Sequence, residues 1–531
     1  MRRQTVTKKE RSASPERETI RLAEPAAGRR QRRTAKRRRE NDEAPDVVPF
    51  AAVRDASVAD EATAREPAPE ETVLLDGLDE LVERDARPAE EPDEETKAPN
   101  QRRERVAPTI VQRALRHPWL MPYNRLAVGV TLLNAALFYA LAESVSLFGH
   151  GIEMATIANI VLANFAVAIV IRLKDVINLL FRVATSAPTD WPLSVRWALG
   201  KVYHFGGIHV GCFFSGALWM GLLLATSMQT GMSSTFTGML GAHVDILGLM
   251  ILTALPQFRH RFHNTFEVVG RFGTWISLAL FWAQTLHFVQ LEHGALGFAE
   301  AASTWQVWVL AGLTFVVALP WMRLRKVPVD VETPSDHAAL ANFDFGIKPF
   351  AGSSTQLSRN PLFEWHSFAN VTRPDEDGFQ LTISRAGDWT GEFIDDPPDE
   401  IWVKALSAAG VGNVETLFDR VLWVATGSGI GPCLPHLLRD EVPADLLWVT
   451  KAPRDTYGDE LVDEILDEIP DAHIWNTDAS GRPDLVEEAF NAYDDSDAEA
   501  VICISNKPTT FELCHEFESH GVPAFGAIWD S

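Results

Sequence analysis

The distribution of apolar positions divides the 531-residue chain into three sections. Before about residue 105 there is almost no periodic apolar pattern, and charged residues come in blocks. From Arg125 to Arg323 long apolar stretches alternate with short polar connections. After residue 327 short apolar runs of strand and helix length follow one another, as in a soluble α/β protein. The pattern therefore predicts a charged tail, a set of long hydrophobic helices, and a region that contains sheets.

Six stretches of the middle section approach the roughly 20 residues that cross a bilayer as a helix. Lys and Arg precede the first stretch, lie between the second and third and between the fourth and fifth, and follow the sixth. The other three connections contain neither residue. Because basic residues favour the cytoplasmic side, this alternation places both chain termini in the cytoplasm. We expect an integral protein of the plasma or inner membrane, with spans at 126–148, 157–173, 201–224, 238–255, 272–289 and 305–319.

Ionisable residues inside the predicted spans are costly in lipid and commonly functional. His209 is expected in the inner half of the third span, His243 and Asp245 in the outer half of the fourth, and His287 near the outer end of the fifth. One interpretation is haem ligation, a proton path or an ion site. The other is hydrogen bonding between helices, and the sequence leaves both open.

The strongest local signal of the third section is the stretch 421–438, VLWVATGSGIGPCLPHLL. A five-residue apolar run leads into Gly427, Gly429, Gly431 and Pro432, and an apolar helical pattern follows. A buried strand, a glycine turn and a helix in this order present backbone N–H groups and a helix N-terminus to a phosphate. The spacing G-x-G-x-G-P differs from the Rossmann fingerprint, so a purely structural turn is the alternative.

The rest of this section alternates between strand and helix patterns. We expect strands at 421–425, 445–450, 472–476, 500–505 and 524–529, with helices at 458–468, 483–493 and 509–520. This alternation predicts a parallel sheet with helical crossovers. Residues 379–384, FQLTIS, alternate as a half-buried strand does, and a small β-barrel is expected around them.

Charge and cysteine content narrow the functional classes. Residues 28–39 are strongly basic and residues 41–97 strongly acidic with many prolines, so residues 1–106 are expected to be a disordered tail. The basic run is either solvated, which we favour, or contacts anionic lipid or nucleic acid. The net charge of −24 argues against a nucleic-acid enzyme. The spacing of the four cysteines indicates neither a zinc site nor a disulfide framework.

Four short segments carry a family resemblance: 364–370, EWHSFAN; 383–390, ISRAGDWT; 426–432, TGSGIGP; and 500–506, AVICISN. After six spans and in this order, they resemble the ferric reductase and NADPH oxidase superfamily, whose cytoplasmic half has the ferredoxin–NADP reductase fold. Within it the chain is most similar to TmpA-type integral membrane flavoproteins, which have a C-terminus like 521–531, GVPAFGAIWDS. The resemblance covers roughly residues 107–531.

The resemblance implies roles for particular residues. The first segment is similar to a flavin motif and places His366, Ser367 and Phe368 beside FAD. The second is similar to a turn that faces the flavin phosphates, with Gly387, Trp389 and Thr390. The third is similar to the loop under the nicotinamide dinucleotide, with Thr426, Gly427, Ser428, Gly429, Ile430, Gly431 and Pro432. Cys503 corresponds to a position near the nicotinamide, and Trp529 to an aromatic residue that stacks on the flavin; these two are the catalytic candidates.

The sequence also departs from the family pattern. Ser367 and Ala369 replace a proline and a threonine of the flavin motif, and Glu364 adds a negative charge near an anionic cofactor. Residues 504–505, Ile-Ser, replace Gly-Pro after the cysteine. The family clamps stacked haems with histidine pairs on its third and fifth spans. Here Val195, Gly270 and Gln284 stand at three of those positions, so the two-haem wire is not expected; His209, His243 and His287 are the remaining haem candidates.

These observations predict a multi-domain membrane protein: a six-helix transmembrane bundle over 107–326, an FAD-binding β-barrel-like domain over 327–417, and an NAD(P)-binding parallel α/β domain over 418–531. We expect it to pass electrons from NAD(P)H through FAD to an unknown acceptor. Lys451 and Arg454 follow the second strand, where they receive an NADPH 2′-phosphate or are solvated beside Asp455. The alternatives are a catalytically degenerate regulatory membrane protein and, on the strength of Asp245, a small-solute or ion carrier.

Overall fold

The computed structural model describes residues 120–148, 152–374 and 376–527. The chain divides into two units, Met1–Pro92 and Asp93–Ser531, and every described residue belongs to the second. The predicted charged tail at 1–106 and Trp529 lie outside the described residues.

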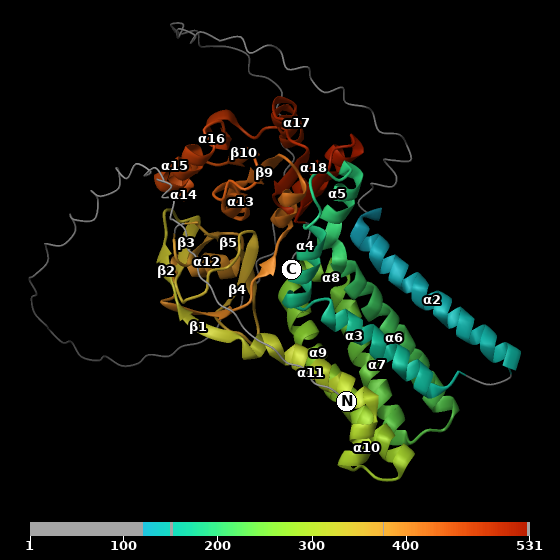
Figure 1. The fold of residues 1–531 in the computed structure, drawn as a ribbon. Coiled ribbons are helices and arrows are strands. Elements are labelled where there is room, and N and C mark those ends of the chain that lie inside the picture. The colour runs from blue at the N-terminus through green and yellow to red at the C-terminus, as the bar shows by residue number, and fades with distance from the viewer. Residues whose placement is uncertain (1–119, 149–151, 375, 528–531) are drawn as a thin grey trace, which may run out of the picture. The chain divides into compact units, whose positions relative to one another are not determined.

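Helices make up the described chain as far as Met322 (Figure 1). Each of the six stretches predicted to be a span lies largely within a helix. Around the bundle, α3 packs on α6, α6 on α7, α7 on α9, α9 on α11, and α11 again on α3, while α2 packs on α6. The elements are α2 (Pro122–Phe148), α3 (Met154–Val170), α4 (Lys174–Ala184), α5 (Leu193–Gly200), η2 (Lys201–Phe205), α6 (Gly206–Gln229), α7 (Ser234–Ala254), α8 (Pro256–Arg261), α9 (His263–His293), α10 (Phe298–Ser303) and α11 (Trp305–Met322).

Length and composition allow fewer membrane crossings than the six predicted. Among the described residues, the helical segments long and apolar enough to cross a membrane are Pro122–Glu143, Leu193–Gln229, Ser234–Ala254 and Trp305–Met322. The pair α3 and α4, bent by 73°, adds a fifth if it forms one span. Helix α9, which contains the predicted span 272–289, is not among them, because polar residues are mixed into its apolar sequence. A six-span bundle therefore stays a prediction.

An antiparallel sheet follows the helices and forms a near-barrel around its own apolar core. Its strand order is β1-β7-β4-β5-β6-β3-β2, and β8 pairs with β4. That core fully buries three strand residues, Leu357, Leu381 and Val403. It also fully buries Phe393, which belongs to helix α12 (Asp388–Asp395). The strands are β1 (Leu324–Pro328), β2 (Asp330–Glu332), β3 (Ala338–Phe343), β4 (Ser353–Ser358), β5 (His366–Val371), β6 (Phe379–Ser384), β7 (Glu400–Lys404) and β8 (Ala408–Ala409).

Strand β6 is present as predicted, but the expectation that it is half-buried is wrong. Both of its faces are covered, from Phe379 to Ile383. One face lines the barrel core, and on the other Thr382 lies against helix α13 (Ile430–Leu437): a Cβ atom on Gly431 would lie 3.2 Å from the Cβ of Thr382. Alternation alone cannot reveal a neighbour that covers the polar face.

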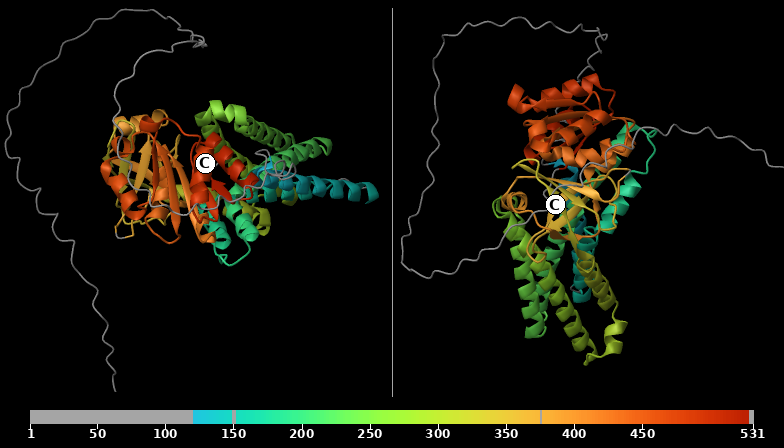
Figure 2. Two further views of the ribbon diagram at one scale, coloured as in Figure 1. Left: turned by 90° about the horizontal axis from the view of Figure 1, so that it is seen from above. Right: turned by 90° about the vertical axis from the view of Figure 1, so that its left-hand side faces the viewer.

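The C-terminal part is a five-stranded parallel sheet, as the strand–helix alternation predicts. Its order is β11-β10-β9-β12-β13. Strands β10 and β11 therefore lie on one side of β9, and β12 and β13 lie on the other. Figure 2 shows these orange and red strands as a group separate from the yellow strands of the antiparallel sheet. The strands are β9 (Val421–Thr426), β10 (Ala444–Thr450), β11 (His473–Asn476), β12 (Ala500–Ile504) and β13 (Ala524–Gly526).

Helices cover both faces of the parallel sheet, which explains why β9 reads as a continuous apolar run. Trp423 and Trp448 are fully buried in the core on one face, while Leu422 and Val424 lie in the core on the other. The helical elements of this part are η3 (Val411–Leu417), η4 (Gly427–Gly429), α13, α14 (Pro453–Tyr457), α15 (Asp459–Glu468), α16 (Thr477–Ser480), α17 (Leu485–Asp495) and α18 (Lys507–Ser519).

An ion pair between a buried arginine and a half-buried glutamate connects the helical section to the parallel sheet. Arg196 of α5 is 5% exposed, and its guanidinium donates two hydrogen bonds to Glu499, of 2.7 and 3.1 Å. The same guanidinium donates to the carbonyl oxygen of Leu417 at 2.8 Å. Glu499 also accepts a hydrogen bond from the backbone N–H of Asp419. This contact fixes the start of β12 against α5.

Candidate functional site

The glycine loop lies where the order of the parallel strands reverses. It leaves the carboxyl end of β9 as η4 and enters α13, next to the carboxyl end of β12. In open α/β sheets, ligands bind in the crevice outside this switch point. The predicted sequence of buried strand, glycine turn and helix is confirmed.

Two glycines of the loop are required by its geometry. A Cβ atom on Gly429 would lie 2.1 Å from the carbonyl oxygen of Ile504, which is far inside contact distance. Gly427 has φ of +50°, a left-handed conformation that other residues seldom adopt. Pro432 lies in the first turn of α13, where its missing N–H costs no helical hydrogen bond. The loop thus holds bare backbone and a helix N-terminus at the sheet edge.

Hydroxyl groups surround the loop. The hydroxyls of Thr426 and Ser505, at the ends of β9 and β12, lie 2.6 Å apart. The hydroxyl of Ser384, at the end of β6, donates to that of Ser428 at 2.7 Å. The indole N–H of Trp448 donates to the carbonyl oxygen of Gly427 at 2.9 Å and fixes the turn. In the sequence Ser505 stands out only because it replaces a proline of the family pattern. Its position directly after a buried strand is the feature that indicates this edge of the sheet.

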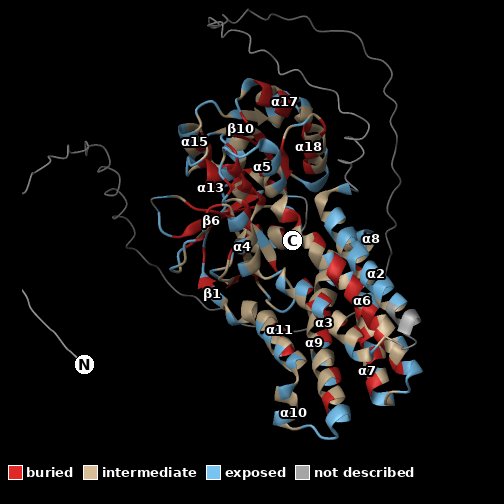
Figure 3. Ribbon diagram, turned by 45° about the vertical axis from the view of Figure 1, so that its right-hand side comes forward, coloured by how far each residue is buried: buried red, intermediate tan, exposed pale blue. Residues whose placement is uncertain are grey.

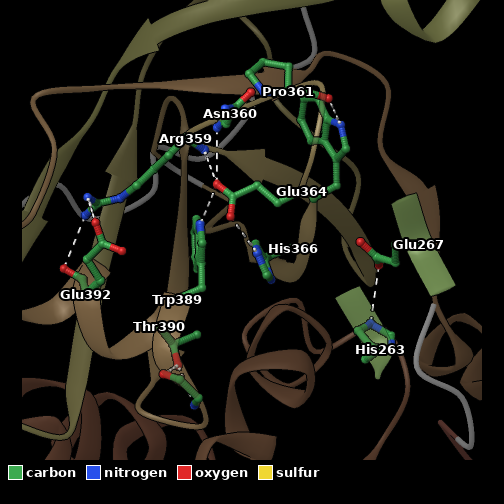
Figure 4. A network of polar contacts seen from close by, with 12 residues as sticks. His263, Glu267, Arg359, Asn360, Pro361, Glu364, His366, Trp389, Thr390 and Glu392 are labelled. Atoms are coloured by element: carbon green, nitrogen blue, oxygen red, sulfur yellow. Dashed lines mark hydrogen bonds and ion pairs between the residues drawn. The ribbon is translucent and has the colours of Figure 1, made fainter. Parts of the chain in front are cut away.

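His366 and Phe368 of the predicted flavin motif form an aromatic cluster with residues of α12; Figure 4 shows His366 beside Trp389. The imidazole of His366 stacks on the indole of Trp389, with ring centroids 4.2 Å apart and an interplanar angle of 24°. Phe368 and Phe393 also lie nearly parallel to that indole, at 5.9 and 5.4 Å. Ser367 is exposed beside them. The structure therefore brings His366, Phe368 and Trp389 together from two segments of the chain.

Glu364 anchors this cluster (Figure 4). Its Oε1 atom accepts hydrogen bonds from the backbone N–H of Arg359 at 3.1 Å, that of Asn360 at 3.2 Å and the indole N–H of Trp389 at 2.9 Å. Its Oε2 atom lies 3.7 Å from Nε2 of His366. The carboxylate expected to oppose an anionic cofactor is therefore engaged by three N–H donors of the protein.

His366 has the character of a ligand-binding group. Burial lowers its pKa, and the carboxylates of Glu364 and Glu267 oppose that shift. Its Nε2 atom is buried and has no hydrogen-bond partner among the described residues. A buried polar atom without a partner is costly, so a phosphate or ribose oxygen at this atom would remove the cost.

The N-terminus of α12 completes this part of the site. The hydroxyl of Thr390 accepts hydrogen bonds from the backbone N–H groups of Ala386 and Gly387, at 2.9 and 3.1 Å, and so closes the first turn. No atom lies within 4 Å of the position where a Cβ on Gly387 would stand, which leaves room for a ligand beside the turn. The N–H groups of Ala386 and Gly387 are thus bonded within the turn, and what the turn offers a ligand is the open space beside Gly387.

The two predicted cofactor segments lie on neighbouring elements. Helix α13, which follows the glycine loop, packs on β5 of the flavin motif. The hydrogen bond between Ser384 and Ser428 joins the strand before α12 to the loop itself. Two ligands bound on these segments would therefore meet at one edge of the molecule.

Cys503 lies apart from this arrangement. Its side chain is fully buried in the core cluster that includes Leu513, Cys514 and Ala524. Burial raises the pKa of its thiol to about 12, so the thiol stays protonated near neutral pH. A role of Cys503 near the nicotinamide stays a prediction, as does that of Trp529.

Each histidine considered as a haem ligand has a protein partner between helices. Nδ1 of His209 lies 2.8 Å from the carbonyl oxygen of Ala168, Nδ1 of His243 lies 3.4 Å from the side-chain oxygen of Gln284, and Nε2 of His287 lies 3.0 Å from the hydroxyl of Ser233. Among the described residues no group of three or more His, Cys, Asp or Glu side chains is arranged to hold a metal ion. These contacts match the hydrogen-bonding interpretation, and the haem question stays open to experiment.

Comparison with known proteins adds two curated relatives. Residues 411–531 match the family model described as "Adenylate-forming reductase 03009, C-terminal domain". The chain is 39% identical over 427 residues to adenylate-forming reductase 03009 of Coprinopsis cinerea, and 37% identical over 429 residues to adenylate-forming reductase 06235 of the same organism. Each alignment covers 79% of this chain and 41% of the relative, so the chain spans about two fifths of the length of these relatives.

Similar solved structures include a ferredoxin NADP⁺ reductase from Neisseria gonorrhoeae with bound FAD and NADP. It is 12% identical, with a TM-score of 0.32, and the match covers 39% of this chain and 98% of that one. The assignment of this chain to an antiparallel near-barrel followed by a parallel sheet rests on its own strand order.

Proposed function

We propose that this chain is a membrane-anchored flavin-dependent oxidoreductase, which takes electrons from NAD(P)H through FAD to an acceptor still to be identified. The observation that carries the proposal is the junction of the glycine loop with the β5–α12 segment through Ser384 and Ser428. In this proposal the two phosphate-binding places that a dinucleotide and a flavin nucleotide require lie on the adjacent elements that this hydrogen bond joins.

In this proposal the chain binds and orients, and the flavin, when bound, supplies the redox chemistry by accepting a hydride. Gly427 and Gly429 allow a pyrophosphate to approach the backbone at the N-terminus of α13. His366 and the α12 turn that Thr390 closes bind the flavin phosphates. Glu364 holds Trp389 and, through it, the stacked imidazole in place.

Membrane anchoring is supported by exposed apolar side chains along the helices. Leu133 of α2 is 70% exposed, Leu252 of α7 60% and Trp308 of α11 61%. Figure 3 shows long exposed segments along α2. Apolar surface of this extent on consecutive helices is expected where lipid covers it. The basic connections support a cytoplasmic location of the sheets in this proposal.

The acceptor follows from what the helices provide. We infer no two-haem wire, because Val195, Gly270 and Gln284 stand at the positions where the family has haem-ligating histidines. Electrons then have no evident route across a hydrocarbon core about 30 Å thick. We therefore place the acceptor on the cytoplasmic side or at the membrane surface. Membership of the ferric reductase and NADPH oxidase superfamily, and the closer tie to TmpA-type flavoproteins, are part of the proposal. The word reductase in the names of the Coprinopsis relatives agrees with redox chemistry.

A second candidate is a regulatory protein that keeps the fold and has lost turnover. The burial of Cys503 supports this candidate, because a thiol enclosed in the core is a poor contact for a nicotinamide. Bound flavin that NAD(P)H fails to reduce is the result this alternative predicts.

One experiment separates the two candidates. The full chain is purified in detergent, its visible spectrum is recorded, and NADH or NADPH is added without oxygen. A flavin spectrum that bleaches supports the oxidoreductase. Protein that is colourless and does not take up FAD on reconstitution contradicts the oxidoreductase, and a haem Soret band would contradict the inferred absence of haem.

A further inference from the structure

The segment after β10 bears on which nicotinamide dinucleotide is used. In doubly wound sheets the adenosine ribose lies near the end of the second strand, where an acidic residue binds its 2′-hydroxyl or a basic residue binds the 2′-phosphate of NADP. Here that strand is β10, and Lys451 and Arg454 follow it directly.

Helix α14, which carries Arg454, adjoins the glycine loop. Its last residue, Tyr457, is buried, and a Cβ on Gly427 would lie 3.7 Å from the Tyr457 hydroxyl. The loop before α14 is held by a hydrogen bond from the backbone N–H of Ala452 to the side chain of Asn476, at 3.0 Å. A dinucleotide with its pyrophosphate on the glycine loop therefore extends its ribose toward this segment.

Both cations of the segment are already engaged by carboxylates. Arg454 contacts Asp459 at 2.9 Å through one guanidinium nitrogen and Asp463 at 2.8 Å through the other. Lys451 lies 3.9 Å from Asp478. Asp455 stands in the first turn of α14, beside Arg454. Together, the two cations and the four carboxylates around them give this surface a net negative charge.

We propose that this site binds NADH in preference to NADPH, an inference that rests on the proposed NAD(P)H-dependent function. A phosphate monoester carries −1.5 to −2 charges near neutral pH. To bind it, Arg454 must leave two carboxylates, and the phosphate then lies beside those carboxylates. The 2′-hydroxyl of NADH is neutral and donates a hydrogen bond to a carboxylate, so it meets no such repulsion.

The expected size of the preference follows from Coulomb interaction at an exposed site. The 2′-phosphate carries up to two negative charges, and the surrounding side chains carry two net negative charges. At about 7 Å in water at physiological salt, their repulsion weakens NADPH binding relative to NADH by on the order of tenfold. The preference should decrease as salt is added, because these groups are exposed.

Binding is compared on the full detergent-solubilised chain, with dissociation constants measured for NADH, NADPH, NAD⁺ and NADP⁺. We expect the phosphorylated member of each pair to bind on the order of tenfold more weakly. The oxidised pair gives the comparison even if no flavin is reduced. Binding with this preference but without flavin reduction would contradict the proposed function and leave the inference intact; equal affinity, or tighter binding of NADPH and NADP⁺, would overturn the inference.

A charge-matched pair of variants assigns the effect to the carboxylates. Asp459→Asn with Asp463→Asn releases Arg454, and the NADP⁺ dissociation constant should fall by on the order of tenfold while that for NAD⁺ changes less than about twofold. Asp467→Asn with Glu468→Gln removes the same charge from exposed positions at the end of α15 and should leave the ratio near that of the wild type. An unchanged ratio in the first variant, or equal changes in both, would overturn the assignment.

Discussion

Gly429 provides the most direct perturbation of the proposed dinucleotide site. Its Cβ, if added, would lie 2.1 Å from the Ile504 carbonyl oxygen, whereas ordinary contacts begin at 3.4 Å. Neither atom can rotate away, because the carbonyl belongs to β12, an interior strand of the sheet. Gly429→Ala must therefore displace the loop or the end of β12 by about 1 Å. A misplacement of this size can cost about a hundredfold in the rate of a catalysed step, and we expect a loss of similar size in dinucleotide affinity.

We expect Gly429→Ala to weaken NADH binding by roughly a hundredfold and to lower the free energy of unfolding by about 1–3 kcal/mol. Gly427→Ala should have a smaller effect, because the nearest atom is 3.7 Å away and the cost is the left-handed backbone, about 1–2 kcal/mol. Binding is measured by titration at a protein concentration well below the dissociation constant, and folding by thermal unfolding of the same samples.

Gly238→Ala in α7 is the control, since no atom lies within 4 Å of its Cβ position and alanine favours a helix. It should leave binding unchanged. Wild-type affinity in folded Gly429→Ala protein would refute the assignment of the loop to the dinucleotide, and weaker binding in Gly238→Ala would show that the loss is not specific to the loop.

Three further changes test other parts of the account. Glu364→Ala removes the acceptor of three hydrogen bonds and should lower FAD affinity and the free energy of unfolding by about 1–3 kcal/mol, with Glu364→Gln intermediate; unchanged FAD affinity in both would contradict the anchoring role. Arg196→Ala removes the two hydrogen bonds from Arg196 to Glu499 and should destabilise by about 1.5–3 kcal/mol in thermal unfolding. The hydrogen bond with Arg196 lowers the folded-state pKa of Glu499. The stability that this pair contributes is therefore present above the unfolded-state carboxyl pKa and is lost as pH falls through the lowered pKa. A stability difference between wild type and Arg196→Ala that grows on acidification would contradict this account. Cys503→Ala should change the flavin reduction rate by less than about threefold, and a loss of a hundredfold or more would restore the catalytic role implied by the resemblance.

The parallel sheet of the C-terminal part and its glycine turn could be predicted because two independent features of the sequence indicate them. The run 421–425 is apolar on both faces, and the glycines follow at the strand end, so burial and turn chemistry indicate the same βα unit. The sequence could not show that β6 is covered on its polar face, since Thr382 is as compatible with solvent as with helix α13.

The role of Glu364 shows a second limit. From the sequence alone, a carboxylate next to a predicted flavin motif is expected to be unfavourable. Only the folded chain brings Trp389 and two backbone N–H groups within hydrogen-bonding distance of Glu364. The number of membrane crossings is a third limit: charge alternation indicates six, whereas length and composition support four or five among the described helices. Long-range partners, rather than local propensity, decide each of these cases.

The central claim is that two nucleotide cofactors meet at the edge between β5 and the glycine loop. It is tested most directly by anaerobic titration of the flavin-loaded full chain with NADH, followed in the visible spectrum. The account predicts loss of the oxidised flavin spectrum at about one equivalent of NADH, and a much weaker response in Gly429→Ala. A flavin spectrum that neither NADH nor NADPH changes, in protein that retains its fold, would contradict this claim.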